Sequence, residues 1–204
     1  MRQPKQLQIE VIDPATLTAP AARVLIAKDA LALLDAEAIV AGTSYYMSVL
    51  SVEQLDMSAG GSVVTAFENA RDNSDSYGYE ELVKRVVLPG YTLLHEWLAD
   101  APVCQVCALG ATFVASARRF NKISVAELPM AMRVPYAEYL QQFFSTDQLD
   151  LIEVAFEGAM CARCDHERVS HQEAKSFYRK FSTDNARLRA ILGNIIDNNG
   201  EFVL

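Results

Sequence analysis

Apolar and polar positions recur at helical spacing along much of this chain. Thr18 is a typical helix-capping residue and Pro20 suits a first helical turn, and from there apolar residues return every three or four positions as far as residue 39. The pattern predicts a helix that ends before Gly42. Its expected core-facing stripe consists of Val24, Ala27, Leu31 and Leu34.

The second half carries the clearest predicted helix boundaries. Serine followed three residues later by Glu or Gln, a pair that can cap each other's backbone amides, occurs at Ser145 and at Ser170. The helix after Ser145 ends at Gly158, and a last helix runs from near Ser182 to residues 199–200, an Asn-Gly pair that can adopt the left-handed conformation. The predicted core positions of these two helices are Leu149, Ile152, Phe156, Leu188, Ile191, Leu192 and Ile195.

Two short stretches favour strands over helices. Residues 43–50 are rich in aromatic and β-favouring side chains, and residues 5–12 alternate polar and apolar. The second stretch fits a loose arm over residues 1–15 equally well. Residues 68–80 hold many small polar side chains, which predicts a flexible loop.

These elements together predict a mainly α fold. We expect a single domain over residues 1–204, arranged like a helical bundle, with at most a small β element near the N-terminal third. A chain of 204 residues in which 51% are apolar can bury one substantial core.

Charge and hydropathy restrict the expected partners. A net charge of −8 makes nucleic acid an unfavourable partner unless basic residues gather on one face. The first residues lack the apolar stretch of a signal peptide, and no run of about 18 apolar residues occurs. We therefore expect a cytoplasmic protein without a membrane partner. The basic residues of two segments are expected on solvated helix faces: Arg118, Arg119, Lys122, Lys175, Arg179, Lys180, Arg187 and Arg189.

Four cysteines occur as two Cys-x-x-Cys pairs, "CQVC" at 104–107 and "CARC" at 161–164. Asp100 and Pro102 predict that a helix opens at the first pair. A thiol pair at a helix N-terminus fits redox chemistry, but that chemistry uses a strand before the pair, and the segment here is predicted to be helical. Redox catalysis is therefore disfavoured.

Zinc is the stronger chemical hypothesis for these cysteines. The ion takes four sulfur or nitrogen ligands in a tetrahedron, and a Cys-x-x-Cys pair lets two sulfurs reach it. One candidate ligand set is local and consists of Cys161, Cys164, His166 and His171. The alternative set joins two segments and consists of Cys104, Cys107, Cys161 and Cys164.

The first pair also fits a core that needs no cofactor. A buried cysteine behaves as a small apolar residue, and residues 108–115 hold enough alanine and glycine to form a slim helix that can lie centrally. For Cys104 and Cys107 this packing interpretation is favoured over zinc. On that interpretation a buried hydroxyl at position 107 costs more than a methyl group, so serine is expected to be tolerated less well than alanine.

No catalytic or cofactor-binding residue is predicted. The chain has no glycine-rich phosphate loop and no Gly-x-Ser-x-Gly motif. Glu153 and Glu157 lie four apart on a predicted helix, a spacing usual for solvent-facing acids, and do not by themselves make an acid–base pair. The sequence therefore favours a protein that is not an enzyme.

Four segments resemble an uncharacterised family of small proteins encoded by bacteriophages and bacterial mobile elements: "ARVLIAKDALALLDA", "CQVCALGATFVASARRFN", "FFSTDQLDLIEVAFEG" and "RLRAILGNIIDNNGEFVL". The resemblance brings no activity with it, but it implies a context in which small acidic proteins occupy a surface of a host protein. We therefore expect a non-enzymatic protein that acts through protein–protein contact, as an inhibitor of a host or defence factor. A zinc-binding protein, structural or catalytic, is the alternative, and a nucleic-acid-binding protein is a third and weaker one.

Overall fold

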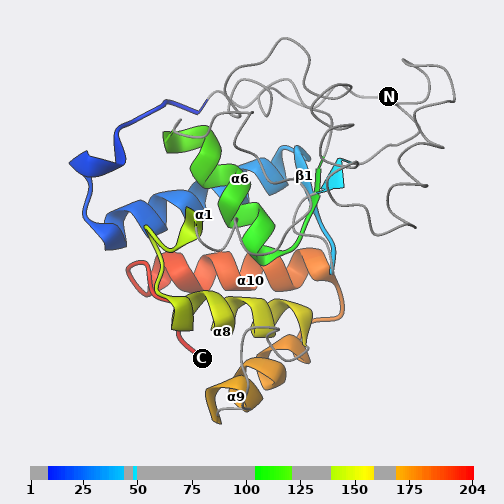
Figure 1. Cartoon of the computed structure of the whole chain (residues 1–204). Helices are drawn as coiled ribbons and strands as arrows, with labels where there is room; N and C mark the ends of the chain where they lie inside the picture. The colour runs from blue at the N-terminus through cyan, green and yellow to red at the C-terminus, as the bar shows by residue number, and fades with distance from the viewer. Residues whose placement is uncertain (1–8, 44–47, 50–103, 121–138, 159–168) are drawn as a thin grey trace, which may run out of the picture.

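The computed structural model describes residues 9–43, 48–49, 104–120, 139–158 and 169–204. Within these ranges the chain is mainly helical, with one small sheet, as the sequence predicts (Figure 1). The elements are η1 (Pro14–Thr16), α1 (Ala19–Asp35), β1 (Ile39–Ala41), β2 (Ser48–Val49), β3 (Cys104–Val106), α6 (Ala108–Phe120), α8 (Thr146–Glu157), α9 (Val169–Tyr178) and α10 (Asp184–Asp197).

Four helices enclose the core. Helix α6 packs against α1 and α8, and α10 packs against the same two helices, lying below α1 and above α8 in the view of Figure 1. Every residue of α6 except Arg119 is buried. Its alanines and glycine let the neighbouring helices approach closely, so the predicted slim central helix is confirmed. Helix α9 packs on α8, outside this group of four.

Helix α1 begins as predicted but ends earlier. Thr18 is its N-cap, and the Thr18 hydroxyl accepts from the Ala21 amide at 3.4 Å. The helix stops at Asp35 because Glu37 turns the backbone into the left-handed region at φ 58°, and residues 39–41 form a strand where a helix was predicted. The buried stripe is also rotated from the predicted one: Val24 and Leu31 are only half-buried. The buried residues of α1 are Ala22, Ile26, Ala27, Asp29, Ala30, Leu33 and Leu34.

The sheet has the order β1-β3-β2, with β3 parallel to β1 and antiparallel to β2. Cys104 pairs with Ile39, and Val106 pairs with Ala41. The prediction that a helix opens at the first cysteine pair is therefore wrong, since residues 104–106 form the central strand. Pairing on both edges satisfies the backbone of this strand, and helix α6 starts only at Ala108.

The helix ends of the second half follow the predicted signals, with one exception. Ser145 caps α8, and Gly158 ends it at φ 69°. Helix α10 is capped by Thr183, one residue after the predicted start, and residues 199–200 both adopt positive φ. Ser170 does not cap α9, because this helix already begins at Val169. All the predicted core residues of α8 and α10 are buried.

Residues 198–204, here called the tail, follow α10 and contact α1, α8 and α9. Arg23 of α1 holds them: its Nε donates to the Gly200 carbonyl at 2.8 Å, and its guanidinium pairs with Glu201. A second nitrogen of Arg23 donates to the Phe143 carbonyl at 2.9 Å. One arginine thus joins α1, the turn before α8 and the tail.

An aromatic cluster packs the turn before α8 against α6. The Phe120 and Phe143 rings stack with centroids 4.9 Å apart, and Tyr139 meets Phe113 edge-on at 5.5 Å. Burial raises the pKa of Tyr139 to about 12, with a small opposing effect from the nearby Ser116 hydroxyl. The phenol therefore stays protonated within the cluster.

Several predictions fall outside the described residues. They are the strand or arm before residue 9, most of the strand at 43–50 and the loop at 68–80. At the other end of the first predicted segment, residues 9–13 form no strand, and the Ile12 amide donates to the Arg119 carbonyl at 2.9 Å. No helix in the described part of the chain has the length and apolar character needed to cross a bilayer.

Candidate functional site

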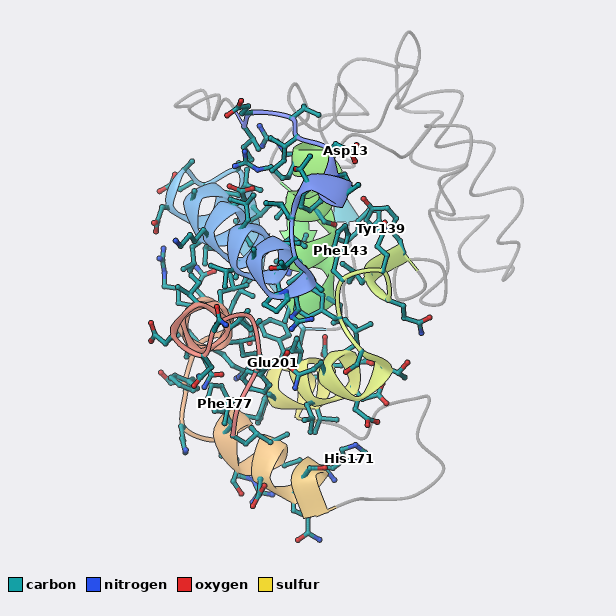
Figure 2. All side chains as sticks on the ribbon, turned by 90° about the vertical axis from the view of Figure 1, so that its left-hand side faces the viewer. Asp13, Tyr139, Phe143, His171, Phe177 and Glu201 are labelled. Atoms are coloured by element: carbon teal, nitrogen blue, oxygen red, sulfur yellow. The ribbon has the colours of Figure 1, made fainter. Side chains whose placement is uncertain are left out.

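Only one residue of the local zinc set lies in the described part of the chain. His171 occupies the first turn of α9, with 1% of its surface exposed, and lies at the end of α9 that follows residues 159–168 (Figure 2). The other members, Cys161, Cys164 and His166, lie outside the described residues. The structure therefore places one predicted ligand in a buried position and leaves the assembly of the set untested.

Cys107 belongs to the alternative set, and its surroundings are those of a packed residue. It lies immediately before α6 and is 2% exposed. Its Sγ accepts from the Gly110 amide at 3.4 Å, and its carbonyl accepts from the Ala111 amide at 2.9 Å, so Cys107 caps the helix. Cys104 is in β3, and its side chain is outside the described part of the structure.

Burial also decides the protonation of this thiol. It raises the pKa of Cys107 to about 12, and the charges of Glu157 and Glu153 add to the rise against the opposing helix amides. Strand β3 begins at Cys104, so the first cysteine of the pair lies in a strand, and the segment predicted to be helical before the pair falls outside the described residues. For Cys107, burial argues against redox chemistry, because a reactive cysteine needs an accessible thiolate.

The acids of α8 differ from the prediction. Glu153 was expected to face solvent, but it is 5% exposed, and Asp150 one turn earlier is 4% exposed. Helix α9, which carries the buried His171, packs on α8. These three side chains each take part in interactions of their own. Among the residues that the structure describes, no three His, Cys, Asp or Glu side chains are grouped as metal ligands.

Three of the predicted solvated arginines are parts of the core structure instead. Arg118 and Arg187 are buried. Arg119 forms a two-pronged ion pair with Asp29 of α1, Nε to Oδ2 at 2.6 Å and Nη2 to Oδ1 at 2.7 Å, and this carboxylate raises the pKa of Arg119. Arg189 pairs with Asp35 on the surface at 2.5 Å. These four arginines are therefore buried or paired, whereas Arg179 and Lys180 remain exposed.

Arg187 joins the ends of three helices. Its Nη1 donates to the Phe156 carbonyl at 3.0 Å and to Asp184 at 2.8 Å. Its guanidinium carbon lies 3.8 Å from the centroid of the Tyr178 ring. The charge thereby fixes the end of α9 against α8 and α10, which makes α9 a firm support for groups on its outer side.

That outer side, together with the tail, forms a surface hollow that the sequence did not predict. The hollow has a volume of about 430 Å³. Phe177 lies at the end of α9 nearer to α10 and the tail, opposite His171 (Figure 2). We call the residues that line the hollow, together with Val203 next to Leu204 in the sequence, the α9–tail surface. They are Gln172, Glu173, Ser176, Phe177, Lys180, Val203 and Leu204.

The apolar part of the α9–tail surface is exposed although its backbone is held in place. Val203 is 51% exposed and Leu204 is 43% exposed, two of the three large apolar side chains exposed in the described ranges. Between them and the core lies Phe202, 2% exposed, whose ring meets Phe177 edge-on at 5.4 Å. The tail is therefore anchored by the side chain of Phe202, and the side chains of the two residues that follow are exposed to solvent.

Two side-chain amides fix the tail in this position. Gln148 of α8 accepts from the Phe202 amide at 2.7 Å and donates to the Phe202 carbonyl at 3.2 Å. Asn194 of α10 makes the equivalent pair of bonds with Val203, at 2.8 and 2.7 Å. Gln148 was predicted to cap Ser145 in return, and it is used here instead. Four hydrogen bonds thus hold the backbone of Phe202 and Val203 in place, while the side chains of Val203 and Leu204 remain exposed.

The composition of this surface resembles that of a small protein-binding site. Phe177 and Leu204 form an apolar centre. The rim around it consists of the uncharged Gln172 and Ser176, the acidic Glu173 and the basic Lys180. Lys180 Nζ lies 5.7 Å from the centroid of the Phe177 ring. An apolar centre within a polar rim is the usual arrangement of protein interfaces. The only signal for this surface in the sequence is the apolar run Phe202, Val203 and Leu204 after the end of a helix, and such a run is equally typical of buried residues.

Comparisons of this chain with protein-family models, with curated proteins and with solved structures find no match.

Proposed function

We propose that this chain is a non-enzymatic protein that acts by binding another protein through the α9–tail surface. The observation that carries the proposal is the exposure of Val203 and Leu204 on a backbone held by Gln148 and Asn194. Exposed apolar side chains on a pre-ordered backbone gain burial on binding without a large loss of conformational freedom. The resemblance to proteins of phages and mobile elements favours a host or defence factor as the partner.

Site-specific photo-crosslinking tests the proposal. A photoreactive residue at the exposed rim position Ser176 is compared with the same residue at Lys28, an exposed position on α1, remote from α9 in Figure 1. We expect a discrete crosslinked protein from a bacterial lysate for Ser176 and none for Lys28. The Ser176 product must also disappear when Leu204→Asp is introduced. Equal products from both positions, or none from either, contradict the proposal.

A zinc-binding protein is the second candidate, and the burial of His171 favours it. His171 is 1% exposed and follows "CARCDH" by only a few residues, a spacing in the sequence that suits a local site of Cys161, Cys164, His166 and His171. The packing of Cys107 at the start of α6, where it is 2% exposed and accepts a hydrogen bond from the Gly110 amide, favours this local set over the set that joins both pairs.

Metal analysis of the chain purified without chelator tests this candidate. A structural site retains about one equivalent of zinc through purification, because such sites bind tightly. His171→Gln should lose that zinc, and the matched Cys107→Ala variant should keep it. Wild-type protein with no bound zinc removes the candidate, and zinc loss from Cys107→Ala transfers the site to the alternative ligand set.

A further inference from the structure

We infer that the α9–tail surface pairs with the same surface of a second copy of this chain, with the two α9 helices antiparallel. The inference deepens the proposed function, on which it rests, by naming an occupant of the surface. Self-pairing of one patch about a twofold axis is the commonest way in which proteins form dimers. It requires a patch whose charges are complementary to themselves.

The charges around the hollow meet this requirement. Glu173 lies three residues before Ser176, and Lys180 lies three residues after Phe177. A twofold axis that passes between Ser176 and Phe177, perpendicular to α9, places Glu173 opposite the partner subunit's Lys180 and Lys180 opposite the partner subunit's Glu173. Lys180 lies in the turn that follows α9, where its amide donates to the Phe177 carbonyl at 3.0 Å, so at about 1.5 Å per helical residue the two charges lie about 10 Å apart. Parallel helices would bring like charges together, so the pattern selects the antiparallel pair.

Both charges are available for such pairing. Neither Glu173 nor Lys180 forms an ion pair with another residue in the described ranges, and both side chains are exposed. Lys180 extends over the Phe177 ring, at the edge of the hollow. The ammonium group is therefore placed beside the apolar centre, where a neighbouring subunit would contact both.

The apolar groups of the surface are complementary in the same way. Each copy offers exposed Val203 and Leu204 beside a hollow of about 430 Å³. The twofold axis keeps both tails on one side of the helix pair, so the apolar side chains of each copy reach the hollow of the other. A surface built on one helix and a short tail is smaller than the roughly 800 Å² per partner of a stable interface, and we expect dissociation constants in about the micromolar range.

Sedimentation velocity of the full chain over a concentration series tests the inference. We expect a monomer–dimer equilibrium in the wild type. Glu173→Lys and Lys180→Glu each place like charges opposite one another and should weaken the dimer at least about tenfold. The double variant, Glu173→Lys with Lys180→Glu, restores opposite charges and should return to within about threefold of the wild type. Lys28→Glu and Glu37→Lys, the same changes at exposed positions of another face, should leave the dimer unchanged.

Specific outcomes overturn the inference. A wild type that remains monomeric at every concentration excludes the dimer. A dimer that the single variants leave intact, or that the double variant fails to restore, excludes this pairing of the helices. A monomer that still yields a discrete product with another protein from the Ser176 photo-crosslinker refutes the inference but leaves the proposed function standing. A dimer whose Ser176 product contains only a second copy supports the inference and refutes binding of a host factor.

Discussion

Replacement of Cys107 by serine and by alanine tests the role of this thiol as a helix cap in the core. Serine is among the best N-cap residues, and its hydroxyl can keep the bond from the Gly110 amide that the thiol now accepts. Alanine cannot accept that bond. The structure therefore reverses the order expected from the sequence, where the thiol was taken to pack without a hydrogen bond.

The magnitudes follow from burial and capping. Alanine loses a cap worth about 1 kcal/mol and leaves the space of a buried sulfur, which costs about 1 kcal/mol more. Serine keeps the cap but buries a hydroxyl in a site that is 2% exposed, at a cost of about 1 kcal/mol. We expect Cys107→Ala to lose about 2 kcal/mol of unfolding free energy and Cys107→Ser about half of that.

Urea unfolding followed by far-UV circular dichroism at neutral pH measures both variants, provided that their denaturant dependence matches that of the wild type. An alanine variant as stable as the serine variant would refute the capping argument. Severe and equal losses in both, together with release of zinc, would show that Cys107 is a metal ligand rather than a packed cap.

Three further predictions concern stability. Asp29→Asn weakens the partly buried pair with Arg119 and should lower the unfolding free energy by about 2 kcal/mol. Asp35→Asn at the exposed pair should change it by less than about 1 kcal/mol in the same urea titration. Gly200→Ala should lose about 3 kcal/mol of unfolding free energy, because φ is +93° and a Cβ would lie 2.7 Å from the Pro20 carbonyl oxygen. Gly193→Ala in the open interior of α10 should gain up to about 1 kcal/mol. Thermal melts should show a lower melting temperature for the first variant and a higher one for the second. Burial raises the pKa of Cys107 from 9.0 to about 12, so its contribution is complete below about pH 9 and is lost at about 1 kcal/mol per pH unit above it. A Cys107→Ala variant that declines just as steeply from about pH 9 to 10 would contradict the last prediction.

The parts of the fold that were predictable have strong local signals. The stripe of Leu188 and Ile191 recurs with helical period, and capping by Ser145 and termination at Gly158 need only neighbouring residues. The misassigned parts depend on distant ones. Strand β3 has three residues and exists through its pairing with β1 and β2, so no local pattern could distinguish it from the start of α6.

The candidate site was harder to predict for the same reason. Glu153 is buried because α8 packs among α6, α9 and α10, although its spacing from Glu157 is that of a solvent-facing pair. Val203 and Leu204 are apolar and would be expected inside. They are exposed because Gln148 and Asn194 hold the tail by hydrogen bonds. Gln148 is far from the tail in the sequence, and Asn194 reaches it around the left-handed turn after α10.

The central claim is that the chain acts through the α9–tail surface, and comparative affinity capture tests it most directly. Wild type, Leu204→Asp and Lys28→Asp are each immobilised, and proteins retained from a bacterial lysate are quantified by mass spectrometry. We expect a partner protein that Lys28→Asp retains as well as the wild type does. Leu204→Asp should retain the same partner at least about tenfold less well, since a charge at an apolar contact opposes its burial. Equal retention by all three proteins would contradict the claim.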